Sequence, residues 1–290
     1  MLRGMSLIRV GMINFTNGLI PDFDFPEKGF KKIYGIPYQL NELLRTGNLD
    51  LSPVSSMEYL LNPKLYKILP GICIASRSYA HTVGVFSDFA PEEWGGKRFL
   101  LTGSSLTSVY LFQVLCKKYL RCSIECVFQA PGEGDMEELF RSAGQYDGLL
   151  LIGDQVREFN RKNLLPYHDL CSLWHRFTGK SFVFALWLAR ADRCLSHLDF
   201  YSKIHSELVH SIESGLENLD AVFEKSQTSW DREEFLSYFQ ESMLYKLEKE
   251  ELEGLKQFSL DLLECEFLKS SLEFDFLQPV AVEGNSPTGS

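Results

Sequence analysis

The sequence predicts an α/β protein of two lobes, followed by a helical C-terminal part. Segments with strand-like apolar patterns alternate with segments of helical spacing from residue 7 to about residue 186. One arrangement, a strand, a small polar turn and a hydroxyl-rich helix start, occurs near residue 55 and again near residue 105. After residue 187 the pattern is helical. We therefore expect two similar lobes that face each other.

The first lobe is expected to begin with residues 1–88. Helical spacing at 38–46 ends at Gly47, a residue typical of the position just after a helix. Residues 50–59 predict the end of a short strand, a tight turn at Pro53 and the first turn of a helix. The remaining strands of this part are predicted at 7–14, 31–38, 66–76 and 82–87.

The second lobe is expected at 89–184, because the pattern breaks at residues 89–96. The continuous apolar run at 149–152 is typical of a strand that is buried on both faces of a parallel sheet. Two further strands are predicted at 97–101 and 122–129. Two helices are predicted as well, one at 106–115 after the hydroxyl-rich turn and one at 135–143.

The chain is expected to return to the first lobe over residues 185–280. The apolar segment at 182–187 predicts the buried strand that makes this crossing. Amphipathic spacing then predicts helices at 198–225, 231–246 and 250–267, and residues 281–290 have the composition of a disordered tail.

Charge and composition limit the classes of partner. The formal net charge of −10 argues against a nucleic-acid partner, because phosphate binding needs a basic face. No apolar run approaches the length of a membrane span, and the N-terminus lacks the pattern of a secretory signal. The seven cysteines include no C-x-x-C pair, which favours reduced thiols in the cytoplasm. The oligomeric state stays open.

The motifs of metal, nucleophile and nucleotide sites are missing. His168 and His175 flank Asp169 and Cys171, but this spacing fits no common zinc site. There is no G-x-S-x-G elbow, no Walker A motif and no G-x-G-x-x-G fingerprint. We expect no metal and no cofactor.

Two hydroxyl-rich helix starts are the strongest candidates for a site. Ser55 and Ser56 begin one helix, and Ser55 has capping-box spacing to Glu58. A helix N-terminus offers unpaired N–H groups and a partial positive charge, which suit a carboxylate or phosphate. The alternative is that the serines only cap the helix.

The second lobe repeats this arrangement with Ser105, Thr107 and Ser108. Asn17 follows the first strand, and Asp154 follows the strand at 149–152, where α/β sheets place ligands. Two facing anion cradles suit a small ligand that carries two carboxylates. The residues by themselves predict a two-lobed binder of a small anion.

Several segments, in the same order along residues 7–190, resemble the chorismate dehydratase family of the futalosine route to menaquinone. Asn17 occupies the Asn of the family's Tyr-Leu-Asn turn, and residues 53–59 resemble its Pro-Ile-Ser-Ser-Ile-Glu-Tyr signature. Its Thr-x-x-Ser-x-Thr-Ser motif matches Thr102, Ser105, Thr107 and Ser108. Residues 150–154 and 178–187 resemble its last two motifs.

The resemblance implies a type II periplasmic-binding-protein-like fold used as a cytosolic hydro-lyase. It implies conversion of chorismate to 3-[(1-carboxyvinyl)oxy]benzoate and water, with the substrate's own enolpyruvyl carboxylate as the base. Ser55 and Ser56 would bind one carboxylate, and Ser105, Thr107 and Ser108 the other. Asn17 and Thr82 would act on the departing hydroxyl and the ring, whereas Asp154 either binds substrate or braces the hinge.

The chain departs from the family pattern at some positions. His81-Thr82 replaces the usual Gly-Ser, Cys171-Ser172-Leu173 replaces Gly-Glu-Glu, Ser181 replaces Pro, and Asn14 and Thr16 are also unusual. One alternative is an enzyme like 1,4-dihydroxy-6-naphthoate synthase, although its Ser-Pro-Cys-Pro-Asn-Asp motif is missing. Another is a non-catalytic binding protein for a small carboxylate, which would bind its ligand without changing it.

Overall fold

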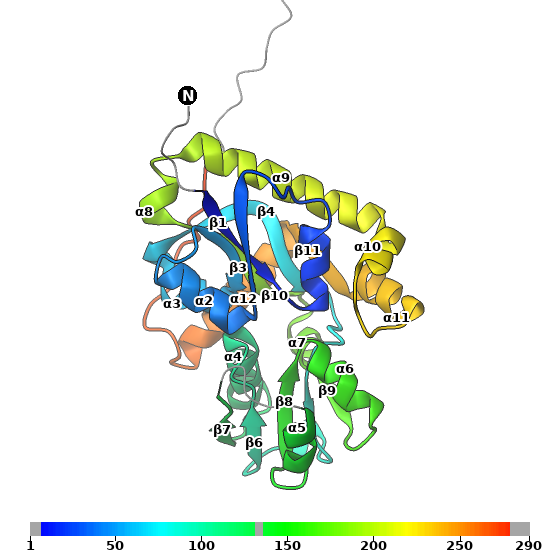
Figure 1. The fold of residues 1–290 in the computed structure, drawn as a ribbon. Coiled ribbons are helices and arrows are strands. Elements are labelled where there is room, and N and C mark those ends of the chain that lie inside the picture. Colours follow the sequence, from blue (N-terminus) through cyan, green and yellow to red (C-terminus); the bar gives the residue numbers. More distant parts are fainter. Residues whose placement is uncertain (1–6, 131–135, 279–290) are drawn as a thin grey trace, which may run out of the picture.

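The computed structural model describes residues 7–130 and 136–278, and in it the strands form two sheets, one in each lobe (Figure 1). The first sheet has the order β11-β4-β10-β3-β1-β2. Strands β1 to β3 run parallel, and β10 lies antiparallel between β3 and β4. Its strands are β1 Ile8–Ile13, β2 Phe30–Gly35, β3 Leu51–Ser55, β4 Tyr66–Ser76, β10 Phe182–Arg190 and β11 Met243–Leu247.

The second sheet has the order β7-β6-β8-β5-β9. Strands β6, β7 and β8 are parallel, and β5 pairs antiparallel with both β8 and β9. As predicted, the apolar run in β8 is buried at every position. The strands are β5 Val83–Phe86, β6 Arg98–Leu101, β7 Glu125–Phe128, β8 Gly148–Ile152 and β9 Tyr167–Asp169.

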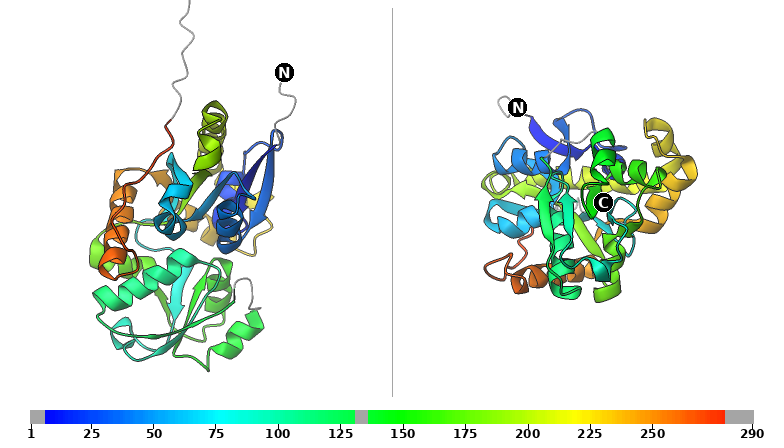
Figure 2. Two further views of the ribbon diagram at one scale, coloured as in Figure 1. Left: turned by 90° about the vertical axis from the view of Figure 1, so that its left-hand side faces the viewer. Right: turned by 90° about the horizontal axis from the view of Figure 1, so that it is seen from below.

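Helices cover both sheets (Figure 2). Helix α12 packs against β10 of the first sheet and α4 of the second lobe, so it spans the junction. The first lobe carries α1 Leu19–Asp22, α2 Pro37–Arg45, α3 Ser56–Leu61, α8 Ala191–Cys194, α9 Leu198–Glu217, α10 Leu219–Lys225, α11 Arg232–Ser237 and α12 Lys249–Glu264. The second carries α4 Leu106–Val114, α5 Met136–Ser142, α6 Asp154–Arg161 and α7 Leu170–Thr178.

The chain crosses between the sheets at residues 77–82 and 179–181. The strand expected at 82–87 in the first lobe therefore belongs to the second sheet, where β5 pairs with β8. Strand β10, expected to begin inside the second lobe, lies wholly in the first sheet. Short apolar strands carry no sequence signal for the sheet they join, because pairing partners are chosen in three dimensions.

One hydrophobic cluster runs from the first sheet through α4 and α7 into the second lobe. It contains Val10 and Trp187 from one sheet together with Phe99 and Trp174 from the second lobe, all fully buried. A smaller cluster lies under α5 and α6. The two lobes thus share a core, which fixes the junction at which polar side chains from both meet.

Two predictions of local structure are wrong. The helix expected at 231–246 ends in a single π-helical turn, Tyr238–Ser242, and is followed by strand β11. Met243, Tyr245 and Leu247 are buried in alternation, since β11 pairs with the open edge of β4. Pro53 makes no turn but lies within β3, opposite Trp187 of β10.

Helix α2 ends before Gly47, whose φ of 76° is left-handed, as predicted. The tail expected at 281–290 lies outside the described residues. Among the helices of the described part, none has the length and apolar character needed to cross a membrane.

A candidate ligand cleft between the lobes

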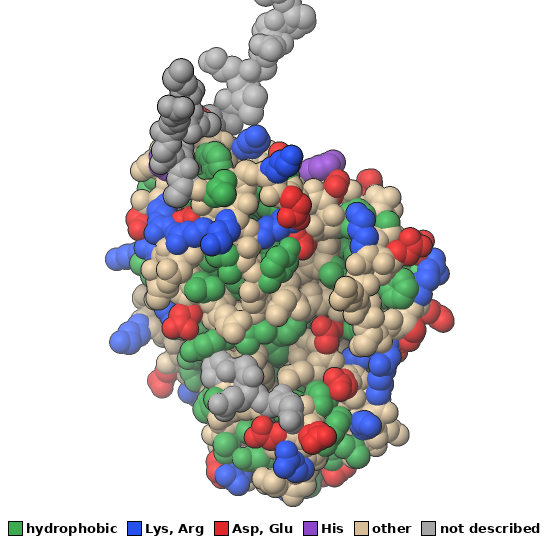
Figure 3. All heavy atoms as spheres, viewed as in Figure 1, with side chains coloured by type: hydrophobic (Ala, Val, Ile, Leu, Met, Phe, Trp, Pro, Cys, Tyr) green, Lys and Arg blue, Asp and Glu red, His purple; other side chains and the backbone are tan. Residues whose placement is uncertain are grey.

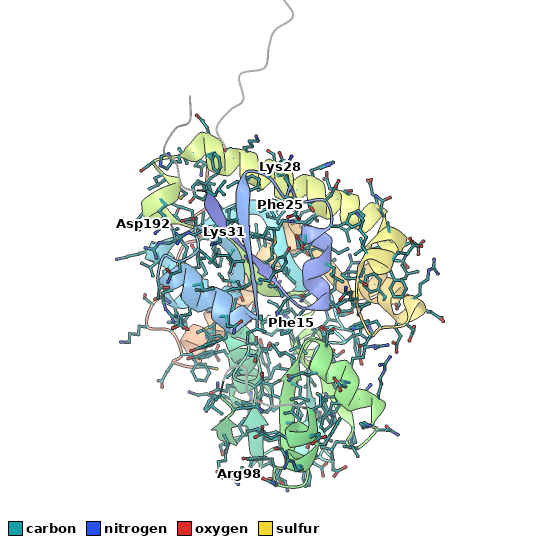
Figure 4. The ribbon with its side chains drawn as sticks, in the orientation of Figure 1. Phe15, Phe25, Lys28, Lys31, Arg98 and Asp192 are labelled. Carbon is teal, nitrogen blue, oxygen red and sulfur yellow. The ribbon has the colours of Figure 1, made fainter. Side chains whose placement is uncertain are left out.

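Five of the predicted site residues line one cleft at the junction of the lobes: Asn17, Ser55, Thr82, Ser105 and Ser108. The cleft encloses about 570 Å³, including the open space at its mouth. Phe15, which lines one wall, lies where the two lobes meet (Figure 4). Hydrophobic side chains gather along the waist between the lobes on the face shown in Figure 3. The other lining residues are Ile13, Pro37, Ile74, Val83, Ile152, Gly153, Phe184, Ala185 and Met243.

Ser55 both caps α3 and faces the cleft. Its Oγ accepts hydrogen bonds from the backbone N–H of Glu58 and from Nδ2 of Asn41, each at 3.1 Å. Asn41 also accepts from the Ser55 backbone N–H at 2.9 Å, so the serine is held on both sides. Because both lone pairs of Oγ are engaged, its hydroxyl proton is the group available to a ligand. The capping prediction and the binding prediction thus concern the same atom.

Ser105 and Ser108 line the cleft from the start of α4. Ser105 caps the helix by accepting from the backbone N–H of Ser108 at 3.3 Å, and the two Oγ atoms are 2.9 Å apart. Two hydroxyls that share one hydrogen bond keep a second proton free for an acceptor. This pair therefore offers a donor to an anion from the second lobe, in addition to the Ser55 hydroxyl of the first lobe.

Asn17 lies in the turn after β1, and its side chain faces the cleft without a protein partner for Oδ1. The backbone carbonyl of Asn17, in contrast, accepts a 2.7 Å hydrogen bond from the hydroxyl of Tyr245. A buried polar atom that lacks a partner is costly, so such atoms are usually satisfied by a ligand or water. This supports an interaction between the Asn17 amide and a bound molecule.

Thr82 lies at the first crossing between the lobes and is 5% exposed. Its Oγ1 donates to the carbonyl of Ala80 at 3.2 Å, and the hydroxyl of Tyr238 lies 3.3 Å away. Its carbonyl accepts from Gly153 at 2.7 Å. Gly153 has a φ of 63°, and an added Cβ would lie 3.2 Å from the Phe15 ring, so a larger residue would disturb this wall.

Ser56 and Thr107 do not line the cleft. Ser56 is fully buried and donates to the carbonyl of Val183 in β10 at 2.8 Å. Thr107 Oγ1 accepts from the backbone N–H of Met57 at 3.1 Å and lies 3.4 Å from Ser56 Oγ. The hydroxyl of Thr107, from the second lobe, therefore caps a backbone N–H at the start of α3 in the first lobe. Ser56 and Thr107 thus join the two lobes beside the cleft.

Asp154 also joins the lobes and lies outside this cleft. As the first residue of α6, it accepts from Thr16 Oγ1 at 2.7 Å and from Trp230 Nε1 at 2.9 Å. Thr16 follows β1, and Trp230 precedes α11, so both partners come from the first lobe. Of the two roles expected for Asp154, this geometry favours the brace.

A buried carboxylate, Asp169, holds the first crossing in place. Its Oδ2 accepts from the backbone N–H groups of Ala80 and His81 at 3.0 and 2.9 Å, while Oδ1 caps α7 by accepting from Ser172 at 3.0 Å. Burial raises the pKa of Asp169 to about 6, and these hydrogen bonds act against that rise. Asp169 was not predicted to act at the site, although its spacing to Ser172 is that of an N-cap.

The described residues that line the cleft include no Asp, Glu, His, Lys or Arg. Donors to an anion must then come from the serine and threonine hydroxyls, the Asn17 amide and backbone N–H groups. Nor do the described residues form a group of three or more His, Cys, Asp or Glu side chains that could hold a metal ion. The cleft is suited to orient an anionic ligand between apolar walls.

Comparison with known proteins places these features in a family. A family model described as menaquinone biosynthesis matches residues 8–261. The chorismate dehydratase of Thermus thermophilus is 31% identical over 187 residues, which cover 57% of this chain and 63% of that protein. The match thus spans less than two thirds of the relative.

Solved structures show the same fold at low sequence identity. A protein from Archaeoglobus fulgidus, 15% identical, gives a TM-score of 0.70 over 90% of this chain and 98% of that chain. A Candida albicans protein with the generic periplasmic binding protein fold, 11% identical, gives 0.67 over 96% and 99%. The aliphatic sulphonate binding protein of Escherichia coli, 12% identical, gives 0.59 over 98% and 96%.

These similarities confirm the predicted periplasmic-binding-protein-like fold with its two sheets and helical C-terminal part. The family model covers more than half of the chain and includes every residue that lines the cleft. The chain belongs to the menaquinone biosynthesis family.

Proposed function

We propose that this protein is a chorismate dehydratase, which converts chorismate to 3-[(1-carboxyvinyl)oxy]benzoate and water. The observation that carries the proposal is the cleft itself. Hydroxyls from both lobes, Ser55 from the first and Ser105 with Ser108 from the second, line a space whose described lining has no ionisable side chain. Similarity to the Thermus thermophilus enzyme and the family match support the same reaction.

Chorismate suits this arrangement because it carries two carboxylates. We assign one carboxylate to the free hydroxyl proton of Ser55 and the other to the Ser105–Ser108 pair. Hydrogen bonds to an ionised acceptor are shorter and stronger than neutral ones, and the apolar walls exclude competing water. Holding both ends fixes the conformer of the ring between Phe15 and Phe184.

The reaction removes the C4 hydroxyl and the C3 proton, and it is downhill because the ring becomes aromatic. As the resemblance to the family implies, we assign the base to the enolpyruvyl carboxylate of the substrate, which takes the C3 proton; a described lining without Asp, Glu or His is consistent with this assignment. The electrons of the C3–H bond form the new ring double bond, and the C4–O bond breaks. Asn17 and Thr82 stabilise the departing hydroxide, and the proton that the enolpyruvyl carboxyl group took from C3 converts it to water.

The proposal extends to the setting of the enzyme. It needs neither metal nor cofactor, and its partner is the small dicarboxylate alone, with no nucleic acid and no membrane. A cytoplasmic location fits a family of biosynthetic proteins and seven cysteines that are all free thiols. Among the alternatives, a non-catalytic carboxylate-binding protein is favoured by one observation, the fold that this chain shares with solute-binding proteins.

Incubation of the purified protein with chorismate tests the proposal. The product is expected to show the ultraviolet band of a benzoate and a mass lower than that of chorismate by one water. Asn17→Ala should lower kcat with the fold intact, whereas the control Asp192→Asn, at an exposed ion pair remote from the cleft, should match the wild type. Thermal stabilisation by chorismate without any product would favour the binding protein instead.

A further inference from the structure

One short stretch of the C-terminal part, residues 230–245, makes three hydrogen-bond contacts with residues that the sequence predicted for the site. Trp230 donates to Asp154 at 2.9 Å, Tyr245 donates to the carbonyl of Asn17 at 2.7 Å, and the Tyr238 hydroxyl lies 3.3 Å from Thr82 Oγ1. This stretch lies beyond the motifs at 7–190 on which the site was predicted. We propose that Tyr238 and Tyr245 are positioning residues for the dehydration, which hold Thr82 and Asn17 in the geometry that the reaction needs. The inference rests on the proposed function and deepens it.

Tyr245 fixes the turn that carries Asn17. The tyrosine is 2% exposed and lies on the buried face of β11, together with Met243 and Leu247. Its phenol donates to the backbone carbonyl of Asn17 at 2.7 Å, and this bond restrains the turn from which Asn17 lines the cleft.

Tyr238 acts on Thr82 more directly, through the hydroxyl. Thr82 has a single hydroxyl proton, which goes to the carbonyl of Ala80 when no ligand is bound. The 3.3 Å contact is then a donation from Tyr238, and burial raises the pKa of Tyr238 so that it keeps its proton. A donor into Thr82 Oγ1 polarises the threonine O–H, which makes it a better donor to a leaving hydroxide.

The same stretch links the site to the brace between the lobes. The rings of Tyr238 and Trp230 are 4.9 Å apart, and Trp230 is the partner of Asp154. Tyr238 also begins the π-helical turn that connects α11 to β11, a conformation often found at functional sites. The contact between the lobes at Asp154 is therefore connected, through the packed rings of Trp230 and Tyr238, to the position of Thr82.

The first test compares Tyr238→Phe and Tyr245→Phe with a matched control, Tyr119→Phe. Each change removes one hydroxyl and keeps the ring. Tyr119 donates at 2.6 Å to the buried carboxylate of Asp261, away from the cleft. Tyr238→Phe and Tyr245→Phe are each expected to lose about five- to tenfold in kcat, with KM changed less than about twofold. The control should lose thermal stability and retain kcat.

A double-mutant cycle separates positioning from general stability. In an Asn17→Ala background, Tyr245→Phe should cause no further loss of kcat, although Tm still falls because the Asn17 carbonyl remains. Tyr238→Phe should likewise add no kinetic loss to Thr82→Val. Multiplicative losses in both cycles, or wild-type kcat in both single variants, would overturn the inference.

The same measurements distinguish a failure of the proposed function from a failure of the positioning inference. If the wild type binds chorismate but does not convert it, the proposed enzymatic function is wrong. The same double-mutant cycles are then measured with the dissociation constant of chorismate in place of kcat. Weaker chorismate binding in Tyr238→Phe and Tyr245→Phe, with non-additivity as above, would still support positioning. A wild type that binds no chorismate would overturn both statements.

Discussion

The carboxylate of Asp154 in the second lobe accepts a 2.7 Å hydrogen bond from the hydroxyl of Thr16 in the first. Beside this contact, Arg157 of α6 forms ion pairs with Asp231 and Glu234, and it lies over the ring of Trp230. All of these groups connect α6 to the first lobe. The family resemblance left the role of Asp154 open, and this geometry favours a brace between the lobes over a contact with substrate.

Asp154→Ala should therefore weaken both stability and substrate binding. The change leaves Trp230 Nε1 without an acceptor at a residue that is 7% exposed, which costs about 1–3 kcal/mol of unfolding free energy. KM for chorismate, the proposed substrate, should rise because the contacts of Asp154 with Thr16 and Trp230 that hold the two lobes together are lost. Urea unfolding and steady-state kinetics measure the two effects. Asp192→Ala, at an exposed ion pair far from the cleft (Figure 4), should change stability by less than about 1 kcal/mol and leave KM unaltered.

Ser55→Ala and Ser56→Ala should separate binding from structure. Ser55→Ala removes the helix cap and the hydroxyl that faces the cleft, so it should cost about 1 kcal/mol and raise KM. Ser56→Ala removes the buried bond to Val183 and the contact with Thr107, neither of which lines the cleft, so it should cost about 0.5–1.5 kcal/mol with KM unchanged. A rise of KM in the Ser56 variant alone would contradict this assignment.

His81→Gly should be more stable than His81→Ala. His81 has a φ of 59°, a left-handed conformation that disfavours any residue with a Cβ. Both variants lose the packing of the ring against Tyr79, whose centroid is 4.3 Å away, but only glycine removes the strain. The expected difference in unfolding free energy is about 1 kcal/mol. Equal stabilities would show that the crossing is not strained at this residue.

Asp169 should make stability depend on pH. Its pKa is raised from 3.8 to about 6 in the folded protein, so the native state binds the proton more tightly than the unfolded chain does. This contribution to stability is complete below the unfolded pKa of 3.8 and is lost as the pH rises through about 6. Its size is on the order of 3 kcal/mol.

Comparison with Asp169→Asn isolates this effect from the other carboxylates. The unfolding free energy of the wild type, relative to the variant, should fall between about pH 4 and pH 6. Equilibrium denaturation in urea across this range measures the slope. A difference that stays constant over the range would mean that the hydrogen bonds to Asp169 hold its pKa at the ordinary value.

Much of the secondary structure follows from local patterns. The apolar run of β8 and the helical spacing of α2 up to Gly47 can be read from neighbouring residues. The 3.1 Å cap at Ser55 is equally local, because its partner is only three residues away. The structure keeps only half of the predicted capping box, since the Glu58 side chain bonds to Tyr66 and Asn62 and not to the start of the helix.

The sequence alone thus determined the α/β fold class, the two hydroxyl-rich helix starts and the family, because these depend on contacts within a few residues or on motif order. Only the tertiary structure decided which hydroxyls face the cleft. Ser55 and Ser56 are adjacent, yet one lines the cleft and the other is buried against β10. It also decided that residues 243–247 form a strand and that Tyr238 and Tyr245 reach the site. A local sequence pattern does not show that the edge of β4 is free to pair with β11. Nor does it show that Tyr238 contacts Thr82, a residue more than 150 positions away.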